Sequence, residues 1–413
     1  MPRCWALSTL LTAAISLLPC PANAGRKKAP PPPPLQLVES TPIETSLGHE
    51  GIPDAHEVWL EMIRGAEDSL DIAQFYVSNT PSSRLEPVLI AIEKAARRGV
   101  AVRILADKGF YDRNYPESLD RLGERKGIEV RLYDARATMG GIQHAKVFLV
   151  DDREVYLGSQ NFDWRSLEHN LELGLRIAEP ETVAACQAVF DADWAWAAGE
   201  EPPPPGDLAA FAERFPVQVA YGEETVALTP VFSPTGWLAE EDSWDLPRLV
   251  GLIDSAESAV RVQLLSYKTT DREGRYFEEL ETALRRAAAR KVDVQLMVAD
   301  WSKRRWSIEG LQSLQALPGV EVKLVTIPEH SGGYIPYARV IHSKFLVVDD
   351  RAAWLGTANW SRDYFLSSRN YGLIVEGAGF VSDLSPLFDE LWTSEYATIV
   401  DPGGTYEAPR YGD

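Results

Sequence analysis

Two short segments of the chain carry the same chemically active side chains at the same spacing. The first holds His144, Lys146 and Asp151, then Gly158, Ser159 and Asn161; the second holds His342, Lys344 and Asp349, then Gly356, Thr357 and Asn359. On a strand, residues i and i+2 point to one face, so each segment aims an imidazole and an ammonium at a common spot. Imidazole can act as nucleophile, acid or base near neutral pH, and ammonium supplies positive charge. The paired segments therefore predict chemistry on an anionic group.

The chain inside each segment predicts a hairpin. After a fully apolar run, Asp151 is followed by Asp152 and Arg153, and residues 349–351 repeat this turn-prone break. Folding back there places the later hydroxyl and amide side chains beside the histidine and lysine. Each half then offers one imidazole, one ammonium, one hydroxyl and one amide. We therefore expect phosphate to be bound by Ser159, Asn161, Thr357 and Asn359.

Two such sets, facing each other, suit phosphoryl transfer. The reaction needs positive charge around the phosphate oxygens, a nucleophile opposite the leaving group, and a proton for that group. Lys146 and Lys344 can supply the charge that metal ions supply elsewhere. One histidine can attack to form a phosphohistidine while the other protonates the leaving oxygen and then activates water. We assign His144 as the nucleophile and His342 as the general acid and base, although the reverse order is also open.

The remaining histidines form neither an HExxH motif nor part of a Cys-rich spacing. These are the patterns that most often hold a catalytic or structural zinc ion. The sequence therefore predicts no metal site and no other cofactor.

The elements that must position these residues also occur twice. Residues 63–72 are echoed by 253–262, residues 98–105 by 290–297, and residues 127–132 by 319–324. The blocks join helices rich in Ala, Leu and Arg to short apolar or alternating strands, which is the pattern of βαβ units. A length of 413 residues suits two or three domains. The sequence therefore predicts an α/β protein made of two duplicated domains.

A presequence and two proline runs mark the predicted boundaries. Arg3, an apolar run over residues 5–18, and the small residues Ala22 and Ala24 match a signal peptide cleaved before Gly25, with an uncleaved anchor as the alternative. We therefore expect an exported protein, secreted or periplasmic, without a stable membrane span. The predicted organisation is a signal peptide (1–24), a proline-rich linker (25–36), a first domain (37–200), a second proline-rich linker (201–207) and a second domain (208–413).

Charge and cysteine usage narrow the class further. The net charge of -20 excludes a protein that coats nucleic acid or an anionic membrane by bulk attraction, so any polyanion must be bound locally. Cys4 and Cys20 leave with the presequence, and Cys186 then has no disulfide partner. It lies at helical spacing with Val183 and Phe190, which predicts a core position. An exported protein without disulfides is more typical of a bacterium than of an animal lysosome.

Both segments match the pattern HxKxxxxD followed by G[ST]xN, and in this the chain resembles the phospholipase D superfamily of phosphodiesterases. Residues 161–167 and 388–396 are similar to the branch containing the animal lysosomal single-strand 5′-exonucleases, and the likeness covers roughly residues 40–400. The resemblance implies two phospholipase D-like domains, each a mostly buried mixed β-sheet flanked by helices. It also implies a pseudo-twofold relation between them and one shared active site that hydrolyses phosphodiester bonds.

The resemblance also assigns a carboxylate. Glu172 stands where the superfamily often places the group that orients the first histidine, His144, whereas the matching segment at 370–372 has no carboxylate. A carboxylate at Nδ1 fixes the imidazole tautomer and stabilises the imidazolium, so the two histidines should differ. Asp151 and Asp349 belong to the same pattern and are catalytic candidates, with an architectural role at the turn as the alternative.

Several functions remain open. The substrate is either the end of a single-stranded nucleic acid, as for an exonuclease, or a phospholipid head group, as for a phospholipase D; a binding module for phosphorylated ligands without turnover is the third hypothesis. Trp164 and Trp360 could line a substrate channel or belong to the core. The run 301–306, the densest basic and aromatic cluster, could contact a polyanion or begin a solvated helix. The sequence predicts no particular oligomeric state.

Overall fold

The computed structural model describes residues 32–113, 116–202, 210–271 and 273–412. The predicted signal peptide (1–24) lies outside the described residues, as do residues 25–31 of the first predicted linker and 203–207 of the second. Residues 33–413 form one compact unit. The linker and domain boundaries given above stay predictions.

The first half alternates helices and strands up to a long helix. Its elements are β1 (Leu35–Ser40), α1 (Ala55–Gly65), β2 (Ser69–Gln74), β3 (Val77–Ser78), α2 (Leu85–Arg98), β4 (Ala101–Asp107), α3 (Lys108–Tyr111), α4 (Pro116–Gly123), β5 (Ile128–Tyr133), α5 (Ala135–Thr138), β6 (Lys146–Val150), β7 (Glu154–Gly158), β8 (Phe162–Asp163), α6 (Trp164–Glu168), β9 (Glu172–Ile177) and α7 (Pro180–Ala197).

The second half repeats the main helices and strands of this order, with an added strand near its start and a short strand at its end. Its elements are α8 (Phe211–Arg214), β10 (Val217–Tyr221), β11 (Glu224–Ser233), the 3₁₀ turn η1 (Glu241–Ser243), α9 (Asp245–Asp254), β12 (Ala259–Leu264), α10 (Glu279–Ala289), β13 (Asp293–Ala299), the 3₁₀ turn η2 (Asp300–Lys303), α11 (Arg305–Gln315), β14 (Val320–Val325), β15 (Phe345–Val348), β16 (Ala352–Gly356), α12 (Arg362–Leu366), β17 (Asn370–Glu376), α13 (Ala378–Thr393) and β18 (Ala397–Ile399).

Each half is built on one mixed sheet. Within the described residues, the strand orders are β1-β9-β7-β6-β2-β4-β5 and β10-β11-β17-β16-β15-β12-β13-β14-β18. The strands β2, β4 and β5 run parallel, as do β12, β13 and β14. The strands β6, β7 and β9 pair antiparallel, as do β15, β16 and β17. The predicted duplicated α/β fold with mixed sheets is confirmed.

The repeated arginine of the second echoed block closes a helix end in both halves. Arg98 donates from Nη2 to the carbonyl oxygens of Ile63 and Ala66, 3.3 and 2.9 Å away, at the end of α1. Arg290 makes the equivalent bonds to Ile253 and Ala256 at the end of α9, 3.0 and 3.3 Å. The last carbonyls of a helix lack partners within it, so these guanidinium groups satisfy them and fix the helix against the next one.

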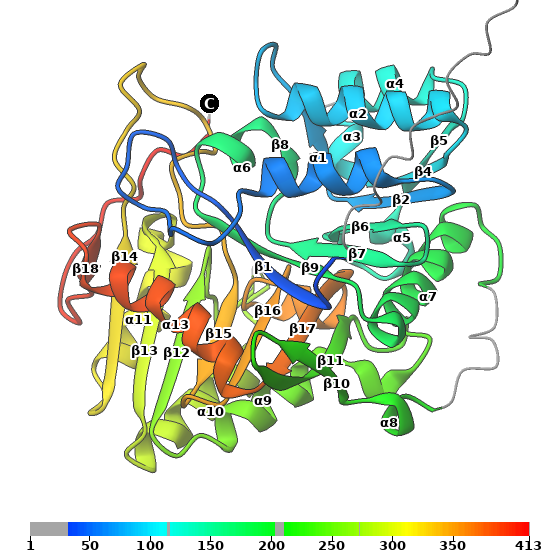
Figure 1. Cartoon of the computed structure of the whole chain (residues 1–413). Coiled ribbons are helices and arrows are strands. Elements are labelled where there is room, and N and C mark those ends of the chain that lie inside the picture. Colours follow the sequence, from blue (N-terminus) through cyan, green and yellow to red (C-terminus); the bar gives the residue numbers. More distant parts are fainter. Residues whose placement is uncertain (1–31, 114–115, 203–209, 272, 413) are drawn as a thin grey trace, which may run out of the picture. The chain divides into compact units, whose positions relative to one another are not determined.

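The sheets are buried on both faces. Helices α1 and α2 cover the outer face of the first sheet, and α9 and α10 cover that of the second (Figure 1). The inner faces meet in a single apolar cluster that includes Leu157 and Leu173 from one sheet and Leu355 and Leu373 from the other. Burial on both faces explains why the strands are almost continuously apolar. The two halves therefore share a core, which holds the ends of their strands at fixed positions.

Helix α7 carries Cys186 into this shared core, as predicted. The thiol is buried and has no disulfide partner, and burial raises its pKa to about 12. It therefore acts as a small apolar side chain. In the described part of the chain, no helix combines the length and the apolar character needed to cross a membrane.

Candidate active site

Two equivalent hairpins carry the signature residues. Strand β6 pairs antiparallel with β7, with Val147 opposite Leu157, and β15 pairs with β16, with Phe345 opposite Leu355. The predicted hairpins are therefore confirmed. Each histidine lies just before the first strand of its hairpin.

The aspartates of the signature hold the turn ends of these hairpins. Asp151 and Asp349 adopt a left-handed backbone, with φ of 53° and 52°, which Asp tolerates better than most residues. Asp151 Oδ1 accepts the amide protons of Asp68 and Ser69 at 2.6 and 2.8 Å. Although burial opposes it, these bonds from backbone amides lower the pKa of Asp151.

Asp349 makes the equivalent contacts in the second half. Its Oδ1 accepts the amides of Ser258 and Ala259 at 2.8 and 3.0 Å. Burial acts to raise the pKa of Asp349, but these hydrogen bonds outweigh it and lower the pKa to about 2. Neither Asp349 nor Asp151 lines the cavity described below. Their place among the catalytic candidates is therefore corrected to the architectural alternative: each carboxylate ties its hairpin to the strand beside it.

A pair of facing glycines leaves room for a large ring in each hairpin. Gly158 lies opposite Gly174, and Gly356 opposite Gly372. A Cβ at Gly174 would lie 2.1 Å from the Tyr156 hydroxyl, and one at Gly372 would lie 2.4 Å from Nε1 of the tryptophan at position 354. Any side chain there would displace the hairpin. The same register makes Asn370, the first residue of β17, the equivalent of Glu172, the first residue of β9.

Backbone hydrogen bonds join the histidine of each half to a segment of the other half. The amide of His342 donates to the carbonyl of Leu171 at 2.8 Å, and the amide of His144 donates to the carbonyl of Arg369 at 3.0 Å. Each histidine is thereby placed against the first residue of a strand from the opposite half. The expected pairing of Glu172 with His144 is therefore wrong, because the contact runs between halves and not within one.

Glu172 is the partner of His342. Its Oε2 lies 2.7 Å from His342 Nδ1, and the carboxylate is fully buried. Burial lowers the pKa of His342, while the negative charge and hydrogen bond of Glu172 act to raise it. A carboxylate at Nδ1 fixes the proton there and stabilises the imidazolium. His342 is therefore equipped to hold and release a proton at Nε2.

His144 has a neutral partner. Its Nδ1 lies 3.0 Å from Asn370 Oδ1. The Asn370 amide group donates to the carbonyls of Tyr364 and Ser368 at 2.7 and 3.1 Å, so its oxygen must face the histidine. An acceptor at Nδ1 requires the proton there, which leaves a lone pair on Nε2. Burial and the nearby Lys146 ammonium hold the pKa of His144 well below 6.5, which favours the neutral imidazole.

The lysines lie buried behind the histidines. Lys146 Nζ donates to the His144 carbonyl at 2.9 Å, and Lys344 Nζ donates to the His342 carbonyl. Burial lowers the pKa of Lys344 to about 7, and burial together with the Lys344 charge holds the pKa of Lys146 well below its usual value. A bound anion would restore both charges, because an opposite charge nearby favours the ammonium form.

The structure separates the four predicted phosphate ligands into two pairs. Asn161 and Asn359 line the cavity. The hydroxyl of Ser159 donates to the Leu173 carbonyl at 3.2 Å, and that of Thr357 donates to Asn370 Oδ1 at 3.0 Å. The two amides therefore face the substrate space, whereas the two hydroxyls are occupied in fixing the strands that carry the histidine partners.

Both histidines and both asparagines open into one cavity of about 270 Å³. It is also lined by aromatic side chains from both halves: Phe75, Tyr76, Phe110, Trp301, Tyr337 and Tyr364. Of these rings, only Trp301 lies in a run that the sequence singled out. One signal was present, since Phe75 and Leu265 each follow the first strand of an echoed block and both line the cavity. Trp164 and Trp360 are not in its lining; Trp360 is a fully buried core residue.

A buried ion pair stabilises the strand end next to the site. Arg369 and Asp193 are both fully buried, with Nη2 and Oδ1 2.8 Å apart. Arg369 also donates to the carbonyls of Ser233 and Trp237 at 2.9 and 2.8 Å. Because Arg369 precedes Asn370, the pair fixes the strand end that orients His144.

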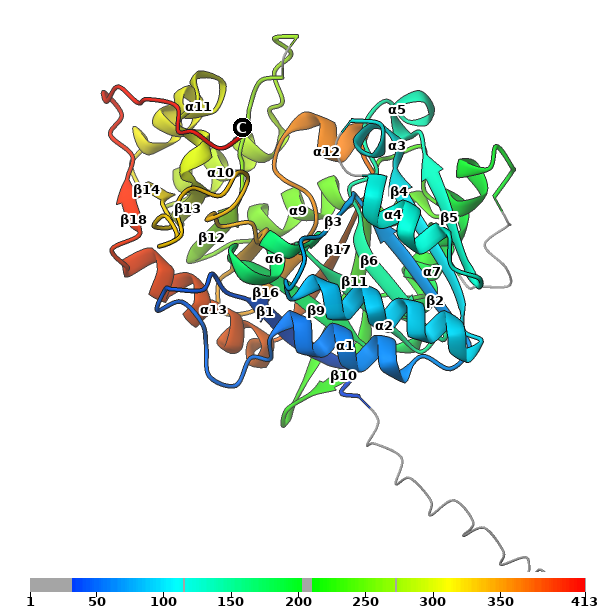
Figure 2. The ribbon, with the colours of Figure 1, turned by 90° about the horizontal axis from the view of Figure 1, so that it is seen from above.

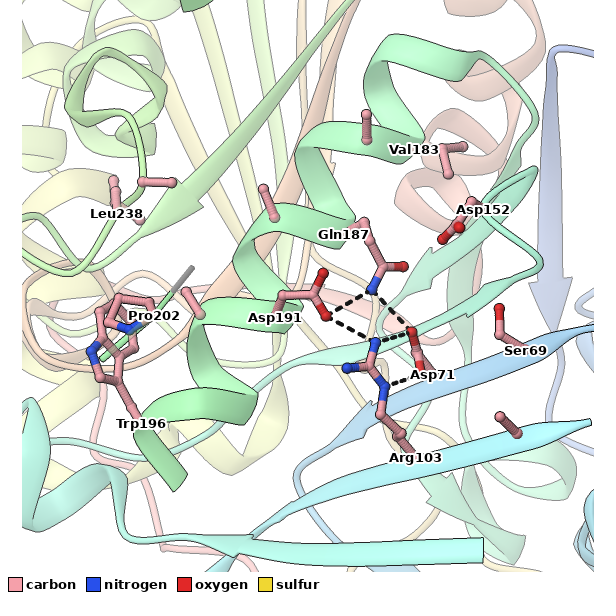
Figure 3. A pocket seen from close by; sticks show the side chains of 15 residues that line it. Ser69, Asp71, Arg103, Asp152, Val183, Gln187, Asp191, Trp196, Pro202 and Leu238 are labelled. Carbon is pink, nitrogen blue, oxygen red and sulfur yellow. Dashed lines mark hydrogen bonds and ion pairs between the residues drawn. The ribbon is translucent and has the colours of Figure 1, made fainter. Parts of the chain in front are cut away.

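A second, larger cavity of about 870 Å³ lies beside α7 on the first half. Figure 3 shows its polar side chains bonded to one another: Arg103 contacts Asp71 and Asp191, and Gln187 bonds to the same two carboxylates. The signature residues do not contribute to its lining. In residues 32–113, 116–202, 210–271 and 273–412, no group of three or more His, Cys, Asp or Glu side chains is placed to hold a metal ion.

A duplicated α/β body with two His-x-Lys segments, whose histidines open into one cavity, defines the site of a two-domain phosphodiesterase. The family model "Cardiolipin synthase, PLD-like domain" matches residues 59–194 and 249–392. The chain therefore belongs to the phospholipase D superfamily and contains two PLD-like domains.

Individual relatives agree with this membership. Over 384 residues the chain is 27% identical to "Phospholipase D Z" of Dictyostelium discoideum, which covers 88% of this chain and 90% of that protein. Over 396 residues it is 30% identical to "5'-3' exonuclease PLD3" of Homo sapiens, with coverage of 88% and 80%. The fold matches a phosphatidylserine synthase of Haemophilus influenzae with a TM-score of 0.59 at 13% identity, covering 83% of this chain and 84% of that one.

Proposed function

We propose that the protein hydrolyses phosphodiester bonds at the ends of single-stranded nucleic acid, through a phosphohistidine on His144 and without a metal ion. The observation that carries the mechanism is the unequal pairing of the two histidines that share the cavity. Asn370 leaves His144 neutral, and Glu172 supports a proton on His342. A nucleophile needs a free lone pair and a general acid needs a proton, so each partner suits one role.

The first step exchanges one bond at phosphorus for another. The Nε2 lone pair of His144 attacks phosphorus, and a P–N bond forms as the P–O bond to the leaving alcohol breaks. His342 gives its Nε2 proton to that oxygen. Lys146 and Lys344 supply positive charge, and the amides of Asn161 and Asn359 supply hydrogen bonds, for the phosphate oxygens.

The second step releases the phosphate. His342, now neutral, takes a proton from a water molecule, and the resulting hydroxide attacks phosphorus. The P–N bond to His144 breaks, and the product is a phosphomonoester. His342 ends the cycle protonated, as it began, because the same group serves as acid and then as base.

Two observations favour nucleic acid as the substrate. The likeness to the 5'-3' exonuclease extends over 88% of the chain, and the cavity is lined by aromatic rings on which bases can stack. A phospholipid is the second candidate, favoured by the likeness to Phospholipase D Z and by the ability of aromatic rings to contact acyl chains. The net charge of -20 does not exclude a strand end, which needs only a local positive site.

A parallel assay tests the proposal. Purified protein beginning at Gly25 is incubated with single-stranded DNA, RNA, and phosphatidylcholine plus ethanol, each with and without EDTA. We expect hydrolysis of a nucleic acid that EDTA does not abolish. Exclusive formation of phosphatidylethanol would support the phospholipid substrate, whereas inactivity on all three would support the binding module. Complete dependence on a divalent metal would contradict the mechanism.

Export is part of the same proposal and rests on the presequence alone. The small residues before Gly25 suit signal peptidase cleavage. N-terminal sequencing of the protein recovered outside the cytoplasm of an expressing bacterium should begin at Gly25. Recovery of the uncleaved chain only in the cytoplasm would contradict export.

A further inference from the structure

Basic and aromatic side chains form one rim of the catalytic cavity. Trp301, in η2, lines the cavity together with Tyr337. The rings of Trp301 and Tyr411 stack with centroids 5.0 Å apart and planes 26° apart, and the Arg304 guanidinium lies 3.4 Å from the centroid of the Tyr411 ring. We call these four residues, Trp301, Arg304, Tyr337 and Tyr411, the Tyr411 platform.

The C-terminal segment completes this platform. After β18 the chain turns back past α11, as the red trace in Figure 2 shows. The amide of Tyr337 donates to the Tyr411 carbonyl at 2.7 Å, and the Tyr334 hydroxyl donates to the Gly412 carbonyl at 3.0 Å. The Tyr337 ring also meets the Tyr411 ring edge-on, at 6.0 Å. The segment is therefore held where its tyrosine extends the aromatic wall of the cavity outward.

The charge of the platform contrasts with that of the whole chain. The chain carries a net charge of -20. Lys303 lies 3.9 Å from Asp300, and Arg305 lies 3.4 Å from Glu309. Between them, Arg304 is exposed, and among the described residues it forms no ion pair; its guanidinium rests on the Tyr411 ring. An unneutralised cation stacked on an aromatic face is suited to a ligand that carries both phosphate and flat rings.

We propose that the Tyr411 platform binds the part of a single-stranded nucleic acid that extends out of the catalytic cavity. A base stacks on the Trp301 ring, Arg304 contacts a backbone phosphate, and the Tyr411 ring, packed between Trp301 and Arg304, holds both in place. The proposal rests on the proposed function and adds a subsite to it. A guanidinium in the middle of the surface disfavours an acyl chain, which would have to desolvate it.

Equilibrium binding tests the platform separately from turnover. The probe is a fluorescein-labelled ten-residue oligothymidylate, measured by anisotropy with the full mature chain carrying His144→Ala, so that cleavage cannot consume it. In this background we compare Tyr411→Ala with Tyr411→Phe, which keeps the ring. Tyr411→Ala removes the ring that supports Trp301 and Arg304, so the stacking of a base on Trp301 should be lost and Kd should rise by about 5- to 150-fold. Tyr411→Phe should bind nearly as well as its parent.

Salt dependence tests the arginine. Each phosphate contact on a single strand contributes about 0.7 to the slope of log K against log salt. Arg304→Ala should lower that slope by about this amount. Arg97→Ala is the matched control, since Arg97 is an exposed arginine of α2 that pairs with Glu93, and it should leave both slope and Kd unchanged.

The outcomes separate this proposal from the proposed function. Equal affinities of the parent and Tyr411→Ala, or no oligonucleotide binding at all, would overturn the platform even if the unsubstituted enzyme cleaves DNA. Binding to phosphatidylglycerol vesicles that is lost in Tyr411→Ala, with oligonucleotide binding unaffected, would assign the surface to lipid. Binding of the oligonucleotide that depends on Tyr411, in a chain with no hydrolytic activity, would support the platform and overturn the catalytic proposal.

Discussion

Replacing Glu172 with glutamine isolates the proton-holding role of His342. The side chain is fully buried and its Oε2 lies 2.7 Å from His342 Nδ1. Glutamine has nearly the same volume, so Glu172→Gln removes the charge while preserving the packing. The imidazolium of His342 loses its counter-charge, and the pKa of His342 should fall.

The expected loss of rate can be bounded. Losing the charge-assisted bond alone is worth about 2 kcal/mol, or about a 30-fold fall in kcat. A carboxylate-to-amide change beside the histidine of a Ser-His-Asp triad costs about 10⁴-fold, because the amide also permits the wrong tautomer. We therefore expect kcat for Glu172→Gln to fall between about 30- and 10⁴-fold, with the alkaline limb of the kcat/KM profile moving to lower pH.

Asn370→Asp is the matched opposite change. It adds a carboxylate at 3.0 Å from His144 Nδ1, which should raise the pKa of His144 and protonate the nucleophile. The acid limb should then move to higher pH. The assay is steady-state hydrolysis over a pH series, with circular dichroism to show that each variant is folded. Unchanged kcat and limbs in Glu172→Gln, or the same limb moving in both variants, would refute the division of roles.

The remaining predictions concern pH and stability. Burial lowers the pKa of both His144 and His342, further for His144, so kcat/KM should be maximal below pH 6.5. It should fall toward neutrality as His342 loses its proton and then Lys344, which has a pKa of about 7. A kcat/KM profile that is maximal above pH 8 would contradict this prediction. Arg369→Met strands a fully buried Asp193 and should lower the free energy of unfolding by about 3–5 kcal/mol, measured in urea. Adding Asp193→Leu should recover most of that loss, and a stable single variant would show that the pair is not needed.

Much of the fold could be predicted because its helices and strands depend on local sequence and occur in two copies. The repeated helix ends at Arg98 and Arg290 and the apolar runs between signature residues predicted the βαβ blocks and the hairpins. Strand alternation predicted that each histidine and lysine would share one face, but each histidine lies just before its strand, and only the histidines line the cavity. Spacing within each half carries this information, since neighbours in these elements are also near in sequence.

The partners of the histidines depend on contacts that no local pattern encodes. The family resemblance assigned Glu172 to His144, but the shared core places the start of β9 against His342 instead. Within the segment 370–372, the register of β17 makes Asn370 the equivalent of Glu172. The partner of each histidine depends on how the two sheets pack, which brings together residues 170 and 226 positions apart.

The rest of the cavity wall was missed for the same reason. Tyr364 comes from α12 and Phe75 from the end of β2, and both meet the His144 ring edge-on at 4.8 and 5.1 Å. The sequence shows that the run at 301–306 is basic and aromatic. Tertiary structure alone places it beside the cavity and packs Tyr411 against Trp301.

Trapping the covalent intermediate tests the central claim most directly. A phosphodiester with a radiolabelled phosphate and a nitrophenyl leaving group needs no proton for its first step, so His342→Ala can form the phosphohistidine but cannot activate water to release it. We predict an acid-labile, alkali-stable label on His342→Ala, mapping to His144, and no label on His144→Ala. Label on His144→Ala at His342 would reverse the assignment, and absence of label from both variants while the unsubstituted enzyme turns over the same ester would contradict covalent catalysis.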